Sequence, residues 1–186
     1  MKSETCIIKD TPIGALCFTW NSAGLTSIDF AGHSCAHDPT PTARSSQLAQ
    51  SIQQQFAEYF LGRRKKFELP VDLTHLTNFQ QKVLRELSKI PHGHTTSYGQ
   101  LAAHCGLPKA ARAVGHVMAL NPLPVLLPCH RILAAGGTLG GYSGGLHIKK
   151  ILLNLEQASS SQPDTSRDAR ETSTTENDGA DLVPCL

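Results

Sequence analysis

The sequence predicts an α+β fold, in which a small N-terminal domain of strands and one helix precedes a mostly helical domain. Three observations support this prediction. Short apolar runs alternate with turn signals at 7–30, large apolar residues recur every four residues at 45–61, and helical patterns dominate after 78. We therefore divide the 186 residues into an N-terminal domain at 1–75, a helical domain at 76–157 and a polar tail at 158–186.

The N-terminal domain begins with strands that are separated by tight turns. The turn signals are TPIG at 11–14 and NSAG at 21–24, and both favour hairpins. A stripe of apolar residues then predicts one amphipathic helix, which Gly62 ends. The stripe consists of Leu48, Ile52, Phe56 and Phe60.

The helical domain contains three predicted helices before its most distinctive motif. An apolar stripe at 79–90 indicates the first, which a proline ends. Ser97 can cap a short second helix at 98–104, and Pro108 suits the first position of a third helix that runs to about Leu120. The second and third helices have the proportions of a helix-turn-helix.

The third of these helices carries basic side chains on one face. Lys109, Arg112 and His116 follow an i, i+3, i+7 spacing, and residues 76–156 carry a net charge of +6. Such a face attracts phosphates and favours nucleic-acid binding. A solvated charged face, or one of the short helix pairs common in enzymes, would give the same pattern.

Composition excludes several classes of protein. No run approaches the ~18 consecutive apolar residues of a membrane-spanning helix, and no apolar segment of the secretory type follows the N-terminus. Six cysteines without a CxxC pair are too few for a disulfide scaffold, so we expect reduced thiols. The tail at 158–186 is polar and acidic, and we expect it to be disordered.

A candidate nucleophilic cysteine, Cys129, lies in the run LPCHR at 127–131. A thiol becomes a useful nucleophile where a neighbouring cation or base lowers its pKa. His130 and Arg131 follow Cys129 directly, but adjacency in sequence does not aim either side chain at the sulfur. An isolated cysteine at the edge of a core is usually structural. The chemical interpretation therefore depends on the rest of the domain.

Three motifs supply that support, because in this order and at these spacings they resemble the O6-alkylguanine-DNA alkyltransferase family. They are PKAARAVG at 108–115, NPLPVLLPCHR at 121–131 and YSGGL at 142–146. The resemblance covers about 79–156 and implies a ribonuclease-H-like N-terminal domain. It also implies DNA repair by stoichiometric alkyl transfer from O6-alkylguanine to the protein's own cysteine, without a cofactor. O4-alkylthymine is a second candidate substrate.

The same resemblance assigns catalytic roles. Cys129 would accept the alkyl group and keep it as a thioether. His130 resembles a histidine that relays the thiol proton through a water, and Glu156 matches the carboxylate behind it. Asn121 matches an asparagine that braces the turn before the cysteine, and Tyr98 a tyrosine that could protonate N3 of the leaving guanine. Taken singly, Glu156 could equally be a surface charge and Asn121 a helix cap.

DNA contacts and a substrate loop are also implied. Arg112 resembles the residue that enters the duplex where the target nucleotide has left, so the partner would be double-stranded DNA bound through its minor groove with a flipped base. The DNA-contacting set is Arg112, Lys109, Ala111, Tyr98 and Arg131. The substrate loop comprises Tyr142, Ser143, Gly144 and Ile132. We expect a monomer without a membrane partner, located in the cytoplasm, or in the nucleus of a eukaryote.

The chain departs from the family at two places. Some members bind zinc in the first domain, but here Cys6 is retained while Asn21 and Thr26 stand at the next ligand positions. The segment HSCAH at 33–37 offers three donors without an evident fourth, so we predict no metal. His116 and Val117 also stand where smaller residues are common, which leaves the fit in the groove open.

Three other functions stay open at this point. The leading alternative is a non-catalytic protein of the same fold that recognises alkylation damage, although such proteins lack the acceptor thiol. A Cys–His hydrolase would leave the basic helix without a role. A helix-turn-helix regulator would leave the LPCHR run without one.

Overall fold

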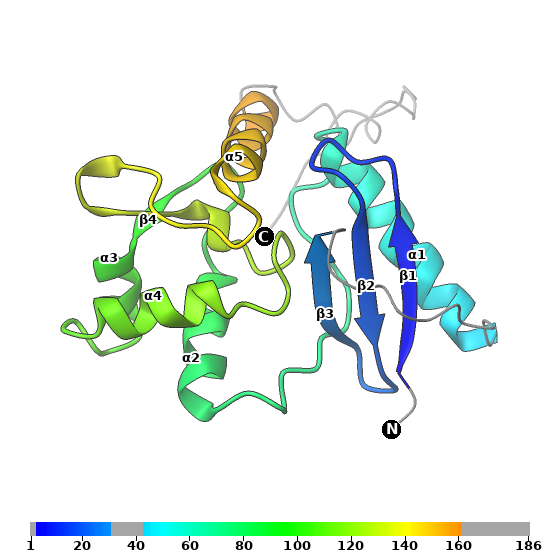
Figure 1. Cartoon of the computed structure of the whole chain (residues 1–186), viewed down its shortest axis with the longest axis horizontal. Coiled ribbons are helices and arrows are strands. Elements are labelled where there is room, and N and C mark those ends of the chain that lie inside the picture. Colours follow the sequence, from blue (N-terminus) through cyan, green and yellow to red (C-terminus); the bar gives the residue numbers. More distant parts are fainter. Residues whose placement is uncertain (1–2, 31–42, 161–186) are drawn as a thin grey trace, which may run out of the picture.

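The computed structural model describes residues 3–30 and 43–160. Figure 1 shows a three-stranded sheet with helix α1 (Ala43–Phe60) on one side of the molecule and the remaining helices on the other. The strands β1 (Glu4–Ile8), β2 (Leu16–Trp20) and β3 (Leu25–Phe30) are antiparallel, in the order β1-β2-β3. The predicted hairpins and the first helix are therefore confirmed.

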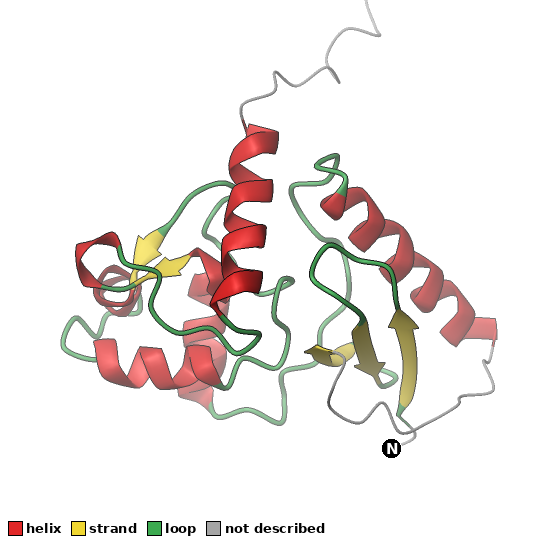
Figure 2. Ribbon diagram, turned by 45° about the horizontal axis from the view of Figure 1, so that its top comes forward, coloured by secondary structure: helices red, strands yellow, loops and turns green. Residues whose placement is uncertain are grey.

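Helix α1 covers one face of this sheet, as the ribbon diagram in Figure 2 makes clear. Phe18 of β2 meets Phe56 of α1 edge to face, with ring centroids 4.7 Å apart. Tyr59, one turn further along α1, is fully buried beside them. The helix thus packs its aromatic face on the sheet, which removes a large apolar area from water.

The helical domain contains α2 (Asn78–Leu87), α3 (Tyr98–His104), α4 (Ala111–Ala119) and α5 (Leu146–Ser160). A capping box starts α3 where the sequence predicts it, since Ser97 and Gln100 each satisfy the other's backbone N–H. Two short parallel strands, β4 (Thr96–Ser97) and β5 (Ile132–Leu133), join the start of α3 to the cysteine segment. They fix Tyr98 relative to Cys129.

The predicted start of α4 is wrong by three residues. Gly106, at φ +72°, ends α3, and the Ala110 N–H then donates to the Leu107 carbonyl in a turn that contains Pro108 and Lys109. The chain needs this turn to change direction before helical hydrogen bonding resumes at Ala111. Pro108 and Lys109 therefore precede the helix instead of opening it.

Helix α5 extends into the predicted tail. It continues to Ser160, whereas the predicted tail begins at Ala158. The Ser159 hydroxyl is buried and donates to the Leu155 carbonyl, 2.8 Å away, so these residues belong to the packed domain. The rest of the predicted tail, at 161–186, lies outside the described residues.

Two properties inferred from composition can be compared with the structure. Cys17 is disulfide-bonded, so the expectation of reduced thiols is wrong at this position, whereas Cys6, Cys105 and Cys129 are free. Within 3–30 and 43–160, no helix is long and apolar enough to cross a membrane.

Candidate active site

Cys129 opens a short 3₁₀ helix (Cys129–Arg131) and is only 4% exposed. Its Sγ accepts a hydrogen bond from Asn121 Nδ2 at 3.1 Å, and the same amide nitrogen donates to the Leu127 carbonyl at 2.8 Å. Asn121 Oδ1 accepts from the Leu123 N–H at 3.1 Å. One side chain thus spans the whole turn before the cysteine and fixes the position of the sulfur.

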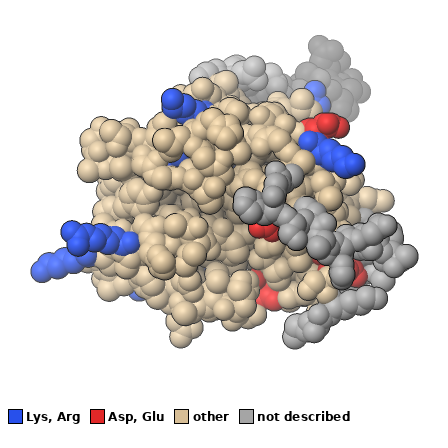
Figure 3. All heavy atoms as spheres, in the orientation of Figure 1, with Lys and Arg blue, Asp and Glu red and all other residues tan. Residues whose placement is uncertain are grey.

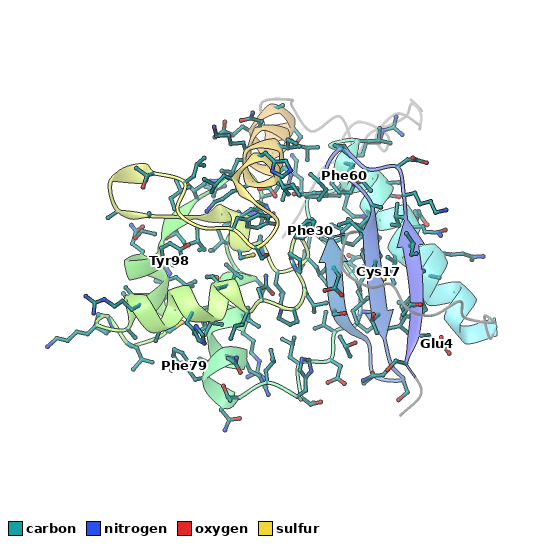
Figure 4. All side chains as sticks on the ribbon, viewed as in Figure 1. Glu4, Cys17, Phe30, Phe60, Phe79 and Tyr98 are labelled. Carbon is teal, nitrogen blue, oxygen red and sulfur yellow. The ribbon has the colours of Figure 1, made fainter. Side chains whose placement is uncertain are left out.

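The thiol lines a cavity of about 220 Å³. The structure brings Tyr98, Tyr142 and Ser143 to this cavity from the predicted site, and Figure 4 shows Tyr98 at the start of α3. The full lining is Tyr98, Gly115, Met118, Ala119, Cys129, Gly141, Tyr142 and Ser143. One wall of the cavity therefore comes from α4 and another from the loop before α5.

His130 is fully buried and turned toward a carboxylate. Its Nε2 lies 2.9 Å from Glu156 Oε1. An ionised carboxylate only accepts hydrogen bonds, so Nε2 carries the proton and Nδ1 keeps its lone pair. Among the described residues, His130 Nδ1 and the Tyr142 hydroxyl are buried polar atoms without a hydrogen-bond partner.

Glu156 is the centre of a buried network. Its Oε1 accepts from His130, from the Tyr59 hydroxyl at 2.7 Å and from Arg131 Nη2 at 2.8 Å. Its Oε2 accepts from Arg131 Nε at 2.9 Å and from the Gly93 N–H at 3.0 Å. Burial raises the pKa of this carboxyl, but the hydrogen bonds from His130 and Arg131 outweigh it and hold the pKa well below its usual range.

The electrostatics of the site favour a neutral pair at rest. Burial raises the pKa of the Cys129 thiol to about 11, although the Asn121 hydrogen bond and the charge of Lys149 act in the opposite direction. Burial also lowers the pKa of His130. Desolvation of the thiolate thus outweighs the neighbouring groups that lower the pKa of the thiol.

Arg131 requires a correction. We predicted a DNA contact, but its guanidinium is buried, forms a two-pronged ion pair with Glu156 and donates to the Ile90 carbonyl at 2.6 Å. A planar guanidinium matches a carboxylate in this way. A side chain held so firmly cannot reach a phosphate outside the fold, and its role is to hold Glu156.

Two members of the predicted substrate loop lie away from the cavity lining. Ile132 is fully buried in β5, where it pairs with Thr96. Gly144 lies beside the ring of Phe30 from the N-terminal domain. Neither contributes to the cavity lining, so the structure does not support direct substrate contact by these two residues.

The predicted DNA-contacting residues of the helix pair lie at the surface. Lys109 and Arg112 are exposed, and Ala111 is half-buried at the start of α4. Figure 3 shows Lys and Arg side chains that project from the edge where Figure 1 places the connection between α3 and α4. His116 is exposed on α4 while Val117 is buried in the core, so only His116 can meet a ligand there.

Two buried polar side chains near the site are absent from the predicted set. Tyr59 lies three residues after Phe56 and thus on the predicted apolar face of its helix, where a hydroxyl is the signal of a buried acceptor. Lys149 interrupts the apolar side of α5 between Ile148 and Leu152. A charged residue within an apolar stripe indicates a buried charge that has hydrogen-bond partners.

Lys149 fastens the substrate loop to the cysteine segment. Its side chain is fully buried, and its Nζ donates to the carbonyls of Ile132 at 2.5 Å, of Gly141 at 3.4 Å and of Leu139. Burial lowers the pKa of this ammonium. Lys149 therefore ties the chain at 139–141, just before Tyr142, to Ile132 of β5.

Replacing Lys149 by methionine should destabilise the protein by about 2 kcal/mol, because buried carbonyls lose their donor. Urea unfolding measures this loss. Lys150→Met is the matched control, since Lys150 is the exposed neighbour on the same helix. Equal unfolding free energies for the two variants would contradict the tethering role of Lys149.

No group of three or more metal-binding side chains occurs within the described part of the chain. Cys6 is a free, half-buried thiol, and burial raises its pKa to about 11. The HSCAH segment at 33–37 lies outside the described residues.

The fold and the site define an α+β protein in which a buried carboxylate supports a histidine and a cavity thiol, an arrangement of the kind used for nucleophilic group transfer. Two family models match the chain in succession. They are "6-O-methylguanine DNA methyltransferase, ribonuclease-like domain" at 5–73 and "6-O-methylguanine DNA methyltransferase, DNA binding domain" at 78–158. The chain belongs to the 6-O-methylguanine DNA methyltransferase family.

Curated proteins and solved structures agree. A methylated-DNA–protein-cysteine methyltransferase of Mycobacterium leprae is 38% identical over 155 residues, which cover 82% of this chain and 92% of the relative. The O6-methylguanine methyltransferase structure from Mycobacterium tuberculosis superposes with a TM-score of 0.73 at 34% identity, covering 88% of this chain and 96% of that one. OGT of the same organism in complex with DNA gives 0.73 at 37% identity, covering 83% and 93%.

Proposed function

We propose that this protein repairs alkylated DNA by moving the alkyl group of O6-alkylguanine onto Cys129, once per molecule. The observation that carries the proposal is the cavity in which Cys129 Sγ is held by Asn121, next to the His130–Glu156 pair. The sulfur–carbon bond forms as the bond between carbon and O6 breaks. A thioether is a poor leaving group, so the protein is consumed.

We infer that the proton of the thiol passes through a water to His130 Nδ1, which has no hydrogen-bond partner among the described residues. Glu156 stabilises the imidazolium that forms, as the oriented carboxylate does in other nucleophilic sites. Tyr98, on the cavity wall, can protonate N3 of the departing guanine. In the net reaction, the thiol loses its proton and gains the alkyl group, and guanine gains one proton in place of that group.

The neutral resting thiol has a consequence for timing. Because burial disfavours the thiolate, ionisation should accompany attack on a bound base and not precede it. This protects the acceptor thiol from unrelated electrophiles. The buried Tyr142 hydroxyl, which lacks a partner in the described part of the chain, is available to the base when it enters.

DNA is the proposed partner. We infer that α3 and α4 act as a helix-turn-helix against the minor groove of a duplex, with the target nucleotide flipped into the cavity. The exposed Lys109 and Arg112 at the start of this unit support the interpretation. We further propose a ribonuclease-H-like first domain, the division at 1–75, 76–157 and 158–186, a monomer and a cytoplasmic location.

Protein mass before and after incubation with duplex DNA that carries one O6-methylguanine tests the function. We expect the gain of one methyl group per molecule, confined to the peptide that contains Cys129. A damage-recognition protein would bind the duplex without a mass change, and a hydrolase would turn over without keeping the group. Either result would overturn the proposal.

Arg112 should matter for duplex DNA and not for the free base. Flipping a nucleotide costs a few kcal/mol of stacking and pairing, and a side chain inserted into the gap offsets part of that cost. Arg112→Ala should therefore slow methyl transfer from duplex DNA by about tenfold to a hundredfold, with little change for free O6-alkylguanine. Arg112→Lys should recover part of the loss, because an ammonium cannot stack as a guanidinium does.

Arg85→Ala provides the matched control for this experiment, because it removes an exposed arginine from α2 instead of α4. Transfer rates are measured on duplex and free base side by side. Equal slowing of Arg112→Ala on both substrates would assign Arg112 to the fold or the cavity and would leave the flipping role to another residue.

A further inference from the structure

The N-terminal domain reaches the active-site loop through one aromatic ring. Phe30 is the last residue of β3, and Figure 4 shows it on the side of the sheet that faces the helical domain. Its ring lies against Tyr142, with centroids 6.0 Å apart and planes inclined by 65°. A residue from the first strands of the chain thus contacts the loop that borders the cavity.

Gly144 shows how close this contact is. A Cβ added at Gly144 would stand 2.8 Å from two carbons of the Phe30 ring and 3.1 Å from a third, and these are its three nearest heavy atoms. Gly144 does not have positive φ, unlike its neighbour Gly145 at φ +88°. The need for glycine at 144 therefore comes from the Phe30 ring and not from the backbone conformation.

Tyr142 connects this contact to the chemistry. Its ring contacts that of Phe30 and also that of His130, whose centroid is 6.5 Å away and whose plane is nearly perpendicular at 86°. Tyr142 is also a wall of the 220 Å³ cavity that contains Cys129. Phe30 is not among the residues of that lining, so it stands behind the wall.

We propose that Phe30 is a positioning residue that holds the Tyr142–Gly144 segment against the cavity and so limits the size of the alkyl group that can be transferred. The inference rests on the proposed function. Phe30 is half-buried, and its ring supports Tyr142 from the side of the N-terminal domain, so removal of its bulk gives Tyr142 more room to move away from the cavity. Small groups benefit from the resulting fixed geometry, whereas large groups need the wall to yield.

The first test measures two alkyl groups in the same duplex, methyl and benzyl, as first-order transfer rates at saturating protein. Phe30→Ala should slow methyl transfer about fivefold to tenfold and slow benzyl transfer less, so that the benzyl-to-methyl ratio rises at least about threefold. DNA affinity should not change, because Phe30 lies away from α4. Phe30→Leu, which keeps most of the bulk, should restore most of the methyl rate.

The second test uses the steric pair directly. Gly144→Ala alone should slow methyl transfer strongly, because the new methyl group pushes the loop away from the ring. Combined with Phe30→Ala, the same substitution should cost little, because the obstructing atoms are gone. This compensation is specific to the contact, since a general loss of stability from two substitutions would add instead of cancel.

The outcomes separate this inference from the proposed function. If the unmodified protein gains no methyl group at Cys129, the proposed function fails. If it does gain one, but Gly144→Ala is equally slow with and without Phe30→Ala and the benzyl-to-methyl ratio stays constant, only the role of Phe30 is overturned. Thermal melting of each variant identifies any that does not fold, and Phe30→Leu then carries the test.

Discussion

Replacing Cys129 by serine should abolish alkyl transfer while leaving DNA binding intact. Among the described residues that line the cavity, Cys129 carries the only thiol, and the hydroxyl that replaces it offers no anion of comparable nucleophilicity. The Asn121 amide can still donate to the new oxygen, so the turn at 121–129 should keep its shape. Mass spectrometry after incubation with methylated duplex should show no gain, while DNA affinity stays unchanged.

Cys105→Ser is the matched control, because Cys105 is also a free, buried thiol but lies at the end of α3 and outside the cavity lining. This variant should still take up one methyl group per molecule. A mass gain in Cys129→Ser, together with none in Cys105→Ser, would move the acceptor role to Cys105.

Removing the carboxylate of Glu156 should produce the largest loss of stability. Glu156→Ala leaves the buried Arg131 guanidinium without its counter-ion and His130 and Tyr59 without their acceptor. Breaking a buried ion pair from one side typically costs about 3 to 5 kcal/mol, which is a large part of the ~5–15 kcal/mol that holds a domain folded. Urea unfolding at neutral pH measures the loss.

The chain offers a control of the same chemistry at the surface. Glu86 pairs with Lys89 at 2.7 Å, a distance close to the 2.8 Å between Glu156 and Arg131, but the Lys89 side chain is 68% exposed. Glu86→Ala should therefore cost about 0 to 1 kcal/mol. Similar losses for both variants would mean that the network around Glu156 contributes little to folding.

The sequence predicts a helix boundary well where residues next to that boundary determine it. Ser97 before the helix and Gly106 after it mark both ends of α3, and the predicted range 98–104 is confirmed. The predicted start of α4 is not, because a turn between Leu107 and Ala110 delays it and Pro108 is compatible with either arrangement. The predicted start of the tail at Ala158 is also wrong, because helix α5 continues to Ser160 through residues of low apolar content.

For the site as well, some features could be predicted from the sequence and others depend on three-dimensional packing. The resemblance named Cys129, His130, Glu156 and Asn121, and the structure joins Asn121 to the thiol and His130 to the carboxylate. The resemblance did not assign Arg131 correctly. Whether this guanidinium binds a DNA phosphate or the carboxylate of Glu156, 25 positions later, depends on three-dimensional packing. The desolvation that keeps the thiol neutral is likewise a property of the packed fold and has no counterpart in residue order.

The hydrogen bond from Tyr59 to Glu156 has an evolutionary consequence. It joins the segment matched by one family model to the segment matched by the other, since Tyr59 lies within 5–73 and Glu156 within 78–158. A recombination that exchanged the first segment for a different one would deprive the carboxylate of a buried donor while every residue of the second segment stayed the same. Selection on the chemistry of Cys129 therefore acts on both segments, and they should be inherited as one unit.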